Sequence, residues 1–121
     1  MNILFETEVT KDIAEKYILL ELDTFLKTQS GDKVRSFCVI TNESIPLQEI
    51  AVMKKNQELH ENLIKNYRLR NWDFCEDAIS HLVGKWKAEA DSFYQILGKR
   101  IQEYKDQPVP VDWDYSIPLP S

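Results

Sequence analysis

Glycine is scarce in this sequence. Only Gly31, Gly84 and Gly98 occur among 121 residues, so few positions can adopt the left-handed backbone that glycine tolerates. Gly-rich loops of the kind that hold phosphate groups are absent. The two cysteines, Cys38 and Cys75, lie far apart in apolar stretches. We predict that both are buried thiols rather than partners in a disulfide.

Basic residues are not in excess either. The net charge is −5, whereas binding to DNA or RNA by counterion release requires a basic surface. The densest basic cluster, residues 65–70, is interpreted as a solvated helix end, because cations at that end complement the helix dipole. The sequence therefore predicts no nucleic-acid partner.

Long apolar runs are missing as well. No stretch approaches the roughly 20 residues that a membrane-spanning helix needs. The first residues carry Glu6 and Glu8 where a secretory signal would carry lysine or arginine. Hydrophobic residues make up 43% and charged residues 29% of the chain, which is ordinary for a globular protein. We predict a cytoplasmic protein that does not bind a membrane.

Motifs for metal binding and catalysis are incomplete. His60 and Glu61 begin like a zinc-protease motif, but the second histidine that the motif needs is replaced by Ile64. His81 has no partner at ligand spacing. Strand alternation and the helix dipole account for the paired carboxylates, which are Glu21 with Asp23 and Glu76 with Asp77. We predict no catalytic, cofactor-binding or metal-ligating residue.

Two β-rich runs occupy the first third of the chain. Residues 17–27 are predicted to form a strand, because apolar side chains recur at a spacing of two and share one face. These side chains are Ile18, Leu20, Leu22 and Leu26. A polar stretch with Gly31 leads to a second run over 33–41, a pattern typical of a β-hairpin. Residues 1–9 are a candidate third strand, and residues 10–16 fit either a loop or one helical turn.

The hydrophobic period then changes to that of helices. We predict a first helix over 47–69. The candidates for its cap and first turn are Asn42, Ser44 and Pro46. Asn71 is predicted to cap a second helix, whose apolar stripe ends at Trp86. A third helix is predicted over 88–104.

These elements predict an α+β fold in a single domain, residues 1–121. A β-hairpin unit (1–45) would pack on a bundle of three helices (46–106), followed by an extended proline-rich tail (107–121). A hairpin alone is marginal in water, so it must pack on the helices or on another chain. The paired helices are similar to tetratricopeptide-type helical hairpins, although no internal repeat is visible.

The tail has four prolines and places Trp113 between two aspartates. A proline-rich segment loses little entropy when it is held extended, and one indole can bury up to about 250 Å². We predict a strap across the protein's own surface, pinned by Trp113; a strand offered to a partner is the alternative. Trp72 and Trp86, at the two ends of the second helix, are predicted to seal the core edge, with ligand stacking as the alternative.

A set of spaced residues runs through the helices and the tail: Tyr67, Trp72, Ala78, Asp91, Arg100, Tyr104, Pro108, Pro110, Asp112, Trp113 and Asp114. This set resembles the C-terminal extension that follows the catalytic domain in many bacterial class III adenylate and guanylate cyclases. Those extensions carry a tyrosine before a helix break, an aromatic-x-x-Ala pattern, and D-G-P with a downstream arginine and tyrosine. They close on P-P-x-D-W-D-G, and the D-W-D piece is the most specific match.

The hairpin is similar to the one that often ends a cyclase domain. The matching residues are Glu21, Leu22, Asp23, Gly31, Lys33, Val34 and Phe37. The sequence departs from the pattern at Tyr115, which replaces the final glycine, and at Ser92 and Phe93, which replace Gly-Pro. Only 17 residues precede the hairpin, so no catalytic residue of the family is carried over. The resemblance implies a cyclase tail without its catalytic domain, as a small viral or mobile-element protein could have.

The function that follows is a non-catalytic interaction or assembly module. Strand edges of the hairpin can pair with another chain, and we expect a homo-oligomer, most simply a two-fold dimer. The candidate anchors are Trp72, Trp86, Tyr104, Trp113 and Arg100. The alternative is a small nucleotide-binding regulator or enzyme with a pocket between hairpin and helices, lined by Trp72, Tyr67 or Arg68.

Overall fold

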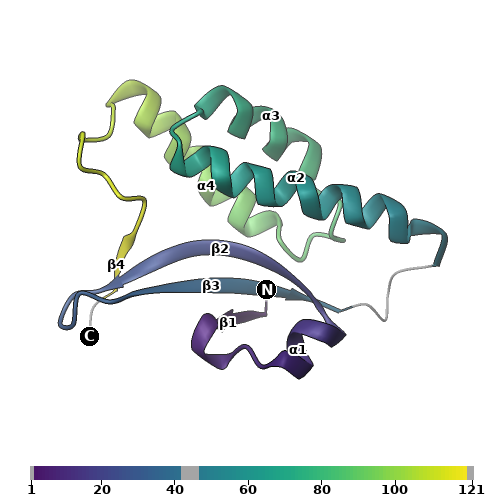
Figure 1. The fold of residues 1–121 in the computed structure, drawn as a ribbon. Helices are drawn as coiled ribbons and strands as arrows, with labels where there is room; N and C mark the ends of the chain where they lie inside the picture. Colours follow the sequence, from purple (N-terminus) through teal and green to yellow (C-terminus); the bar gives the residue numbers. More distant parts are fainter. Residues whose placement is uncertain (1, 42–46, 120–121) are drawn as a thin grey trace.

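The computed structural model describes residues 2–41 and 47–119. The predicted α+β class is confirmed, with a four-stranded sheet in the order β1-β3-β2-β4. The strands are β1 (Ile3–Phe5), β2 (Ile18–Lys27), β3 (Lys33–Ile40) and β4 (Ile117–Leu119). The helices are α1 (Lys11–Lys16), α2 (Ile50–Arg68), α3 (Trp72–Leu82) and α4 (Asp91–Asp106), with short 3-10 turns η1 (Glu6–Glu8) and η3 (Leu47–Glu49). The three long helices lie together on one side of the sheet, and α3 is farthest from it (Figure 1).

The predicted hairpin is present as β2 and β3. They pair antiparallel, and Gly31 in their connection has a φ of 76°, a conformation that favours glycine. The candidate third strand is β1, which pairs antiparallel with β3. Residues 10–16 form a helical turn rather than a loop, because the Thr10 side chain accepts a hydrogen bond from the Ile13 N–H (3.2 Å) and caps α1.

A bulge changes the buried face of β2. The register shifts between Glu21 and Thr24. Before the bulge Leu20 lies in the core, whereas after it Leu26 pairs with the exposed Lys33. One extra residue in one strand turns every later side chain to the other face. The prediction that Leu26 shares the face of Leu20 is therefore wrong.

The helix boundaries differ from the prediction at one connection. The first predicted helix corresponds to η3 and α2, while its predicted cap lies outside the described residues. The second helix ends at Leu82, not at Trp86, because Gly84 follows with a φ of 81° and leaves the helical path. The N–H of Gly84 donates to Asp91 Oδ1 (2.8 Å). This bond ties the end of α3 to the first residue of α4, which begins later than predicted.

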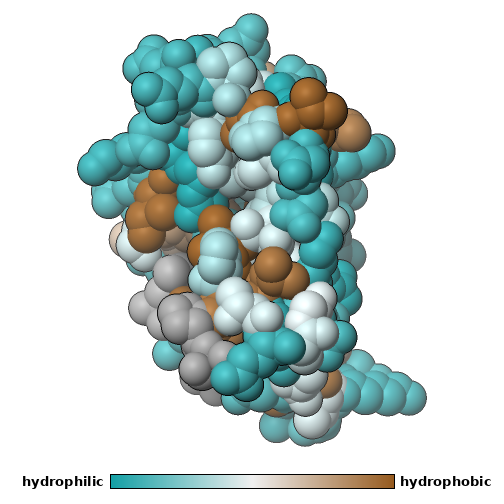
Figure 2. Space-filling model, turned by 90° about the vertical axis from the view of Figure 1, so that its left-hand side faces the viewer, coloured by the Kyte–Doolittle hydropathy of each residue, from teal (hydrophilic) through white to brown (hydrophobic). Residues whose placement is uncertain are grey.

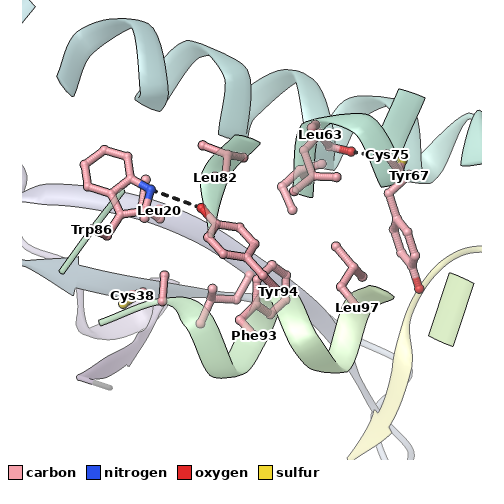
Figure 3. Close-up of a cluster of buried hydrophobic side chains, with 14 of the residues drawn as sticks. Leu20, Cys38, Leu63, Tyr67, Cys75, Leu82, Trp86, Phe93, Tyr94 and Leu97 are labelled. Atoms are coloured by element: carbon pink, nitrogen blue, oxygen red, sulfur yellow. Dashed lines mark hydrogen bonds between the residues drawn. The ribbon is translucent and has the colours of Figure 1, made fainter. Parts of the chain in front are cut away.

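The main core lies between the sheet and the three long helices (Figure 3). Trp86 is only 1% exposed and fills the core from the α3–α4 connection. Cys38 and Cys75 are both buried and free, which confirms that they are thiols. Burial raises the thiol pKa to about 11 for Cys38 and about 12 for Cys75. Both side chains therefore act as small apolar groups.

A chain of buried hydrogen bonds crosses this core. His60 Nε2 lies 2.6 Å from the carbonyl oxygen of Glu21, which can only accept, so Nε2 carries the proton. His60 Nδ1 is then the acceptor for the Tyr94 hydroxyl at 2.9 Å. The Tyr94 oxygen in turn accepts the indole N–H of Trp86 at 3.1 Å (Figure 3). All three bonds form only when each group donates to the next, from Trp86 through Tyr94 and His60 to the Glu21 carbonyl. These bonds link α2 to the edge of β2.

The tail crosses back over the protein as a strap, as predicted. It then forms a strand, which the sequence did not indicate. Residues Ile117–Leu119 form β4, which pairs parallel with the C-terminal end of β2. In Figure 1 the tail descends from the end of α4 to the sheet. It therefore links the helical layer to the strand layer.

Candidate functional site: the aromatic anchor of the tail

Trp113 lies at the centre of an aromatic cluster. Its ring centroid is 5.4 Å from Tyr67, 5.7 Å from Trp72 and 5.6 Å from Tyr104, all in edge-to-face geometry. Tyr115 adds a fourth ring at 6.3 Å. Edge-to-face pairs at these distances are favourable beyond the area that they bury. We call these five residues the aromatic anchor; Figure 2 looks onto the end of the molecule where the tail lies, and shows pale and brown side chains between hydrophilic ones.

Arg70 fixes the backbone of the tail. Its guanidinium donates to the carbonyl oxygens of Pro110 (3.1 Å), Val111 (2.9 Å) and Trp113 (3.3 Å). It also lies over the Trp113 ring, 5.5 Å from the centroid. The left-handed backbone of Arg70 (φ 64°) turns the chain between α2 and α3. The interpretation of residues 65–70 as merely a solvated helix end is wrong for Arg70, whose guanidinium bonds to the tail, and for Arg68, which pairs with Glu21.

A largely buried ion pair lies next to the anchor. Arg100 on α4 donates to both carboxylate oxygens of Asp23, at 2.7 and 3.2 Å, and to the Tyr67 hydroxyl at 3.3 Å. Burial disfavours the charged guanidinium, yet the hydrogen bonds and charge of Asp23 keep the Arg100 pKa above its ordinary value. Burial also raises the pKa of Tyr67. The pair joins the β2 bulge to α4, and Tyr67 joins it to the anchor.

Arg68 forms a second link between the helices and the sheet. Its guanidinium pairs with the Glu21 carboxylate, donates to the Thr24 hydroxyl at 3.3 Å and lies 4.7 Å from the centre of the Tyr115 ring. Glu21 also faces Arg35 at 3.8 Å. The two carboxylates predicted to share a strand face are thus separated by the bulge, since Asp23 pairs with Arg100 instead. Each has its own cationic partner, which is not the arrangement of an acid–base pair.

The space between hairpin and helices at this point is small. Its lining includes Tyr67, Arg68 and Tyr115, but not Trp72. The volume is ≈ 10 Å³, which is room for about one water molecule. Sites for small organic ligands need roughly 300 Å³ or more. This space, which Tyr115 of the tail lines, is therefore too small for such a ligand. A second hollow between β2 and α2, lined by Glu21, Ile64 and Arg68, has a volume of ≈ 310 Å³.

The structure brings together most of the residues predicted as anchors. Trp72, Tyr104 and Trp113 are in mutual ring contact, and Arg100 reaches them through Tyr67. Trp86 is not part of this site, because it lies in the core beside Tyr94. The sequence did not indicate the roles of Arg70, Tyr115 and His60. Arg70 could have been noticed as a donor-rich residue directly before a helix cap, but nothing in the sequence gives its partner.

The Asp23–Arg100 pair is expected to contribute measurably to stability. Both side chains are 16% exposed, so Asp23→Ala leaves a nearly buried cation and should lower the free energy of unfolding by about 2 kcal/mol. The double variant Asp23→Ala/Arg100→Met should recover part of that loss in urea denaturation. Lys105→Met is the matched control: its ion pairs with Asp73 and Glu76 lie at the surface and should contribute little to stability. Equal losses for Asp23→Ala and Lys105→Met would contradict the assignment.

Other chemistry is not assembled among the residues that the structure describes. No group of three or more histidine, cysteine or acidic side chains gathers as metal ligands in residues 2–41 and 47–119. Every buried side-chain nitrogen or oxygen in these residues has a hydrogen-bond partner. Within the same residues, no helix has both the length and the apolar character to cross a membrane. No family model, no curated protein and no solved structure matches this chain.

Proposed function

We propose that this α+β protein is a non-catalytic interaction module that assembles with itself, most simply as a dimer in the cytoplasm. One contrast carries the proposal. The buried side-chain nitrogen and oxygen atoms of the described residues all have hydrogen-bond partners, whereas apolar side chains of β1 and α4 remain open to solvent: Ile3 is 50% and Ile96 is 55% exposed. Buried polar groups that are all hydrogen-bonded within the protein favour a structural role for those groups rather than a catalytic one. Exposed apolar side chains favour contact with another protein.

We also propose kinship with the C-terminal extensions of class III cyclases, and a similarity of the α2–α3 pair to tetratricopeptide helices. Two features support the kinship. The residues that carry the resemblance meet in space, since Tyr67, Trp72, Tyr104 and Trp113 form the anchor. Tyr115 has a φ of 58°, a conformation that favours glycine, and the cyclase pattern has glycine at this place. A viral or mobile-element origin remains part of the same proposal.

Static light scattering coupled to size exclusion tests the assembly. The expected result is a mass of twice the 14.2 kDa chain at micromolar concentration. A mass of one chain across the whole concentration series would overturn the proposal.

The alternative, a nucleotide-binding function, is tested by thermal shift. The water-sized space beside Tyr67 does not favour it, whereas the ≈ 310 Å³ hollow at Arg68 is the place where a nucleotide would have to bind. A nucleotide at 100 times its Kd would stabilise the protein by about 2.7 kcal/mol. We expect no shift for purine or pyrimidine mono-, di- and triphosphates, and a shift with any of them would favour the alternative.

A further inference from the structure

The two edges of the sheet are treated differently by the fold. The outer edge of β2 is covered from its middle to its C-terminal end, because the Glu21 carbonyl accepts from His60 and residues 25–27 pair with β4. The opposite edge is β1, which no described strand covers. An open strand edge is a template for pairing with another strand. Among the described residues, no strand lies on the outer side of β1, so this edge of the sheet is open.

The hydrogen-bond pattern shows which groups are free there. The N–H of Val39 donates to the Asn2 carbonyl (2.8 Å), so Asn2 and Val39 form a hydrogen-bonded pair. Hydrogen-bonded and non-hydrogen-bonded pairs alternate along antiparallel strands. Ile3, opposite Cys38, must point its N–H and C=O away from β3. Phe5 points the same way, but its N–H is occupied by Glu8 Oε1 at 3.0 Å.

A groove on the helix side adjoins this edge. Ile3, Phe5 and Phe25 form its floor, and Phe93 and Ile96 form the wall toward α4. Its volume is ≈ 240 Å³. The polar side chains at its base are engaged elsewhere: Asp23 pairs with Arg100, and the Ser36 hydroxyl donates to the Asp23 carbonyl. The groove therefore presents mainly apolar surface.

We propose that the β1 edge and this groove are one isologous interface, occupied by a second copy of the same chain. Two copies of β1 would pair antiparallel across a two-fold axis at Ile3, and each copy would cover the other's Ile96 side of the groove. This inference deepens the proposed assembly and rests on it.

Three physical points select a second copy as the occupant. An antiparallel pair centred on Ile3 lets the free N–H and C=O of each copy bond to the same groups of the other, which is the self-complementarity that a two-fold axis requires. The acidic residues Glu6 and Glu8 then lie at opposite ends of the junction, with the two Glu6 about 20 Å apart at roughly 3.4 Å per residue. Like charges are thus kept apart.

The third point concerns area. One residue pair at a strand edge cannot bury the roughly 1,200–2,000 Å² of a stable interface. Apolar contact must supply most of it. The groove is on the same side of the sheet as the side chains of Ile3 and Phe5, so strand pairing brings the two grooves together. The β1 edge sets the register of the two copies, and the groove supplies most of the buried apolar area.

Sedimentation velocity of the full chain tests the interface with two variants. Ile96→Lys places a charge in the groove, and Ile3→Pro removes the outward N–H without touching the bonds between β1 and β3. Each is expected to raise the dimer Kd by at least about tenfold, as truncation of a central contact does. The control is Val52→Lys on α2, an apolar residue of similar exposure (56%), which should leave the Kd unchanged. Circular dichroism melts confirm that each variant is folded.

The outcomes separate the two proposals. A wild-type chain that sediments as a monomer at every concentration overturns the assembly itself. A wild-type dimer whose Kd is unchanged in both folded variants overturns this interface and leaves the assembly in place. A dimer weakened by both variants and not by Val52→Lys supports both.

Discussion

Replacement of Trp113 by alanine is expected to lower the free energy of unfolding by about 2 kcal/mol, less than the usual loss for a fully buried aromatic side chain because Trp113 is partly buried. The indole contacts three rings from α2, α3 and α4 and one from the tail itself. The Arg70 guanidinium also lies over the indole ring. Its removal takes away the central member of the aromatic anchor, so the contacts of the remaining rings loosen together.

Urea denaturation and limited proteolysis measure this effect. The tail should become the first site of cleavage in Trp113→Ala, because its remaining contacts through β4, Arg70 and Tyr115 lie at the surface and open more readily than the core. Val111→Ala is the control within the same segment, since Val111 is 96% exposed and should change stability by less than about 0.5 kcal/mol. If Trp113→Ala were as stable and as protease-resistant as Val111→Ala, the tail would not be pinned by this ring.

Mild acid is expected to destabilise the protein through His60. Burial lowers the His60 pKa from its ordinary 6.5 to about 4. The unfolded state therefore binds more protons than the folded state between these values, and stability falls as the pH drops from about 6.5 to about 4. The loss should reach about 2 kcal/mol by pH 5. Protonation would also turn Nδ1 into a donor and leave the Tyr94 hydroxyl hydrogen without an acceptor.

His60→Gln tests the cause. Glutamine can donate to the Glu21 carbonyl and accept from Tyr94, but it does not titrate. The variant should be less stable than wild type at pH 7, and its stability should be nearly constant from pH 7 to pH 5. His81→Gln, at the exposed histidine of α3, should keep the wild-type pH slope. A slope that survives in His60→Gln would assign it to other groups.

The range from pH 7 to pH 5 lies above the pKa values of Glu6 and Asp114. Hydrogen bonds from Arg35 lower the pKa of Glu6 from its ordinary 4.5. Hydrogen bonds from Ser116 and Lys33 lower the pKa of Asp114 from 3.8 to about 2. Groups with depressed carboxyl pKa values lose their contribution only as the pH falls through and below these ordinary values. Between pH 7 and pH 5 the expected slope therefore belongs mainly to His60.

Several elements could be predicted from local pattern. The spacing of two in β2 and the polar stretch with Gly31 determine the hairpin, because side-chain alternation and turn geometry are local properties. The stripes of α2 and α4 follow from helical periodicity. The strap follows from the prolines around Trp113, since stiffness and a large apolar side chain are both readable in the sequence. These predictions hold in the structure to within a few residues at most boundaries.

Other features could not be predicted because they depend on partners distant in sequence. The bulge in β2 places Asp23 toward Arg100, and no local pattern distinguishes a bulge from regular alternation. The partner of Arg70 lies 40 or more residues away in the tail. The pairing of β4 with β2 depends on where the strap ends, which is decided by the position of the aromatic anchor.

The sequence by itself determined the hairpin, the three long helices and the extended tail, because those states depend on neighbours along the chain. Only the tertiary structure decided that His60 would be a neutral donor to the edge of β2 and that the β1 edge would stay open. Burial and hydrogen-bond geometry set both, and they exist only once the helices lie on the sheet.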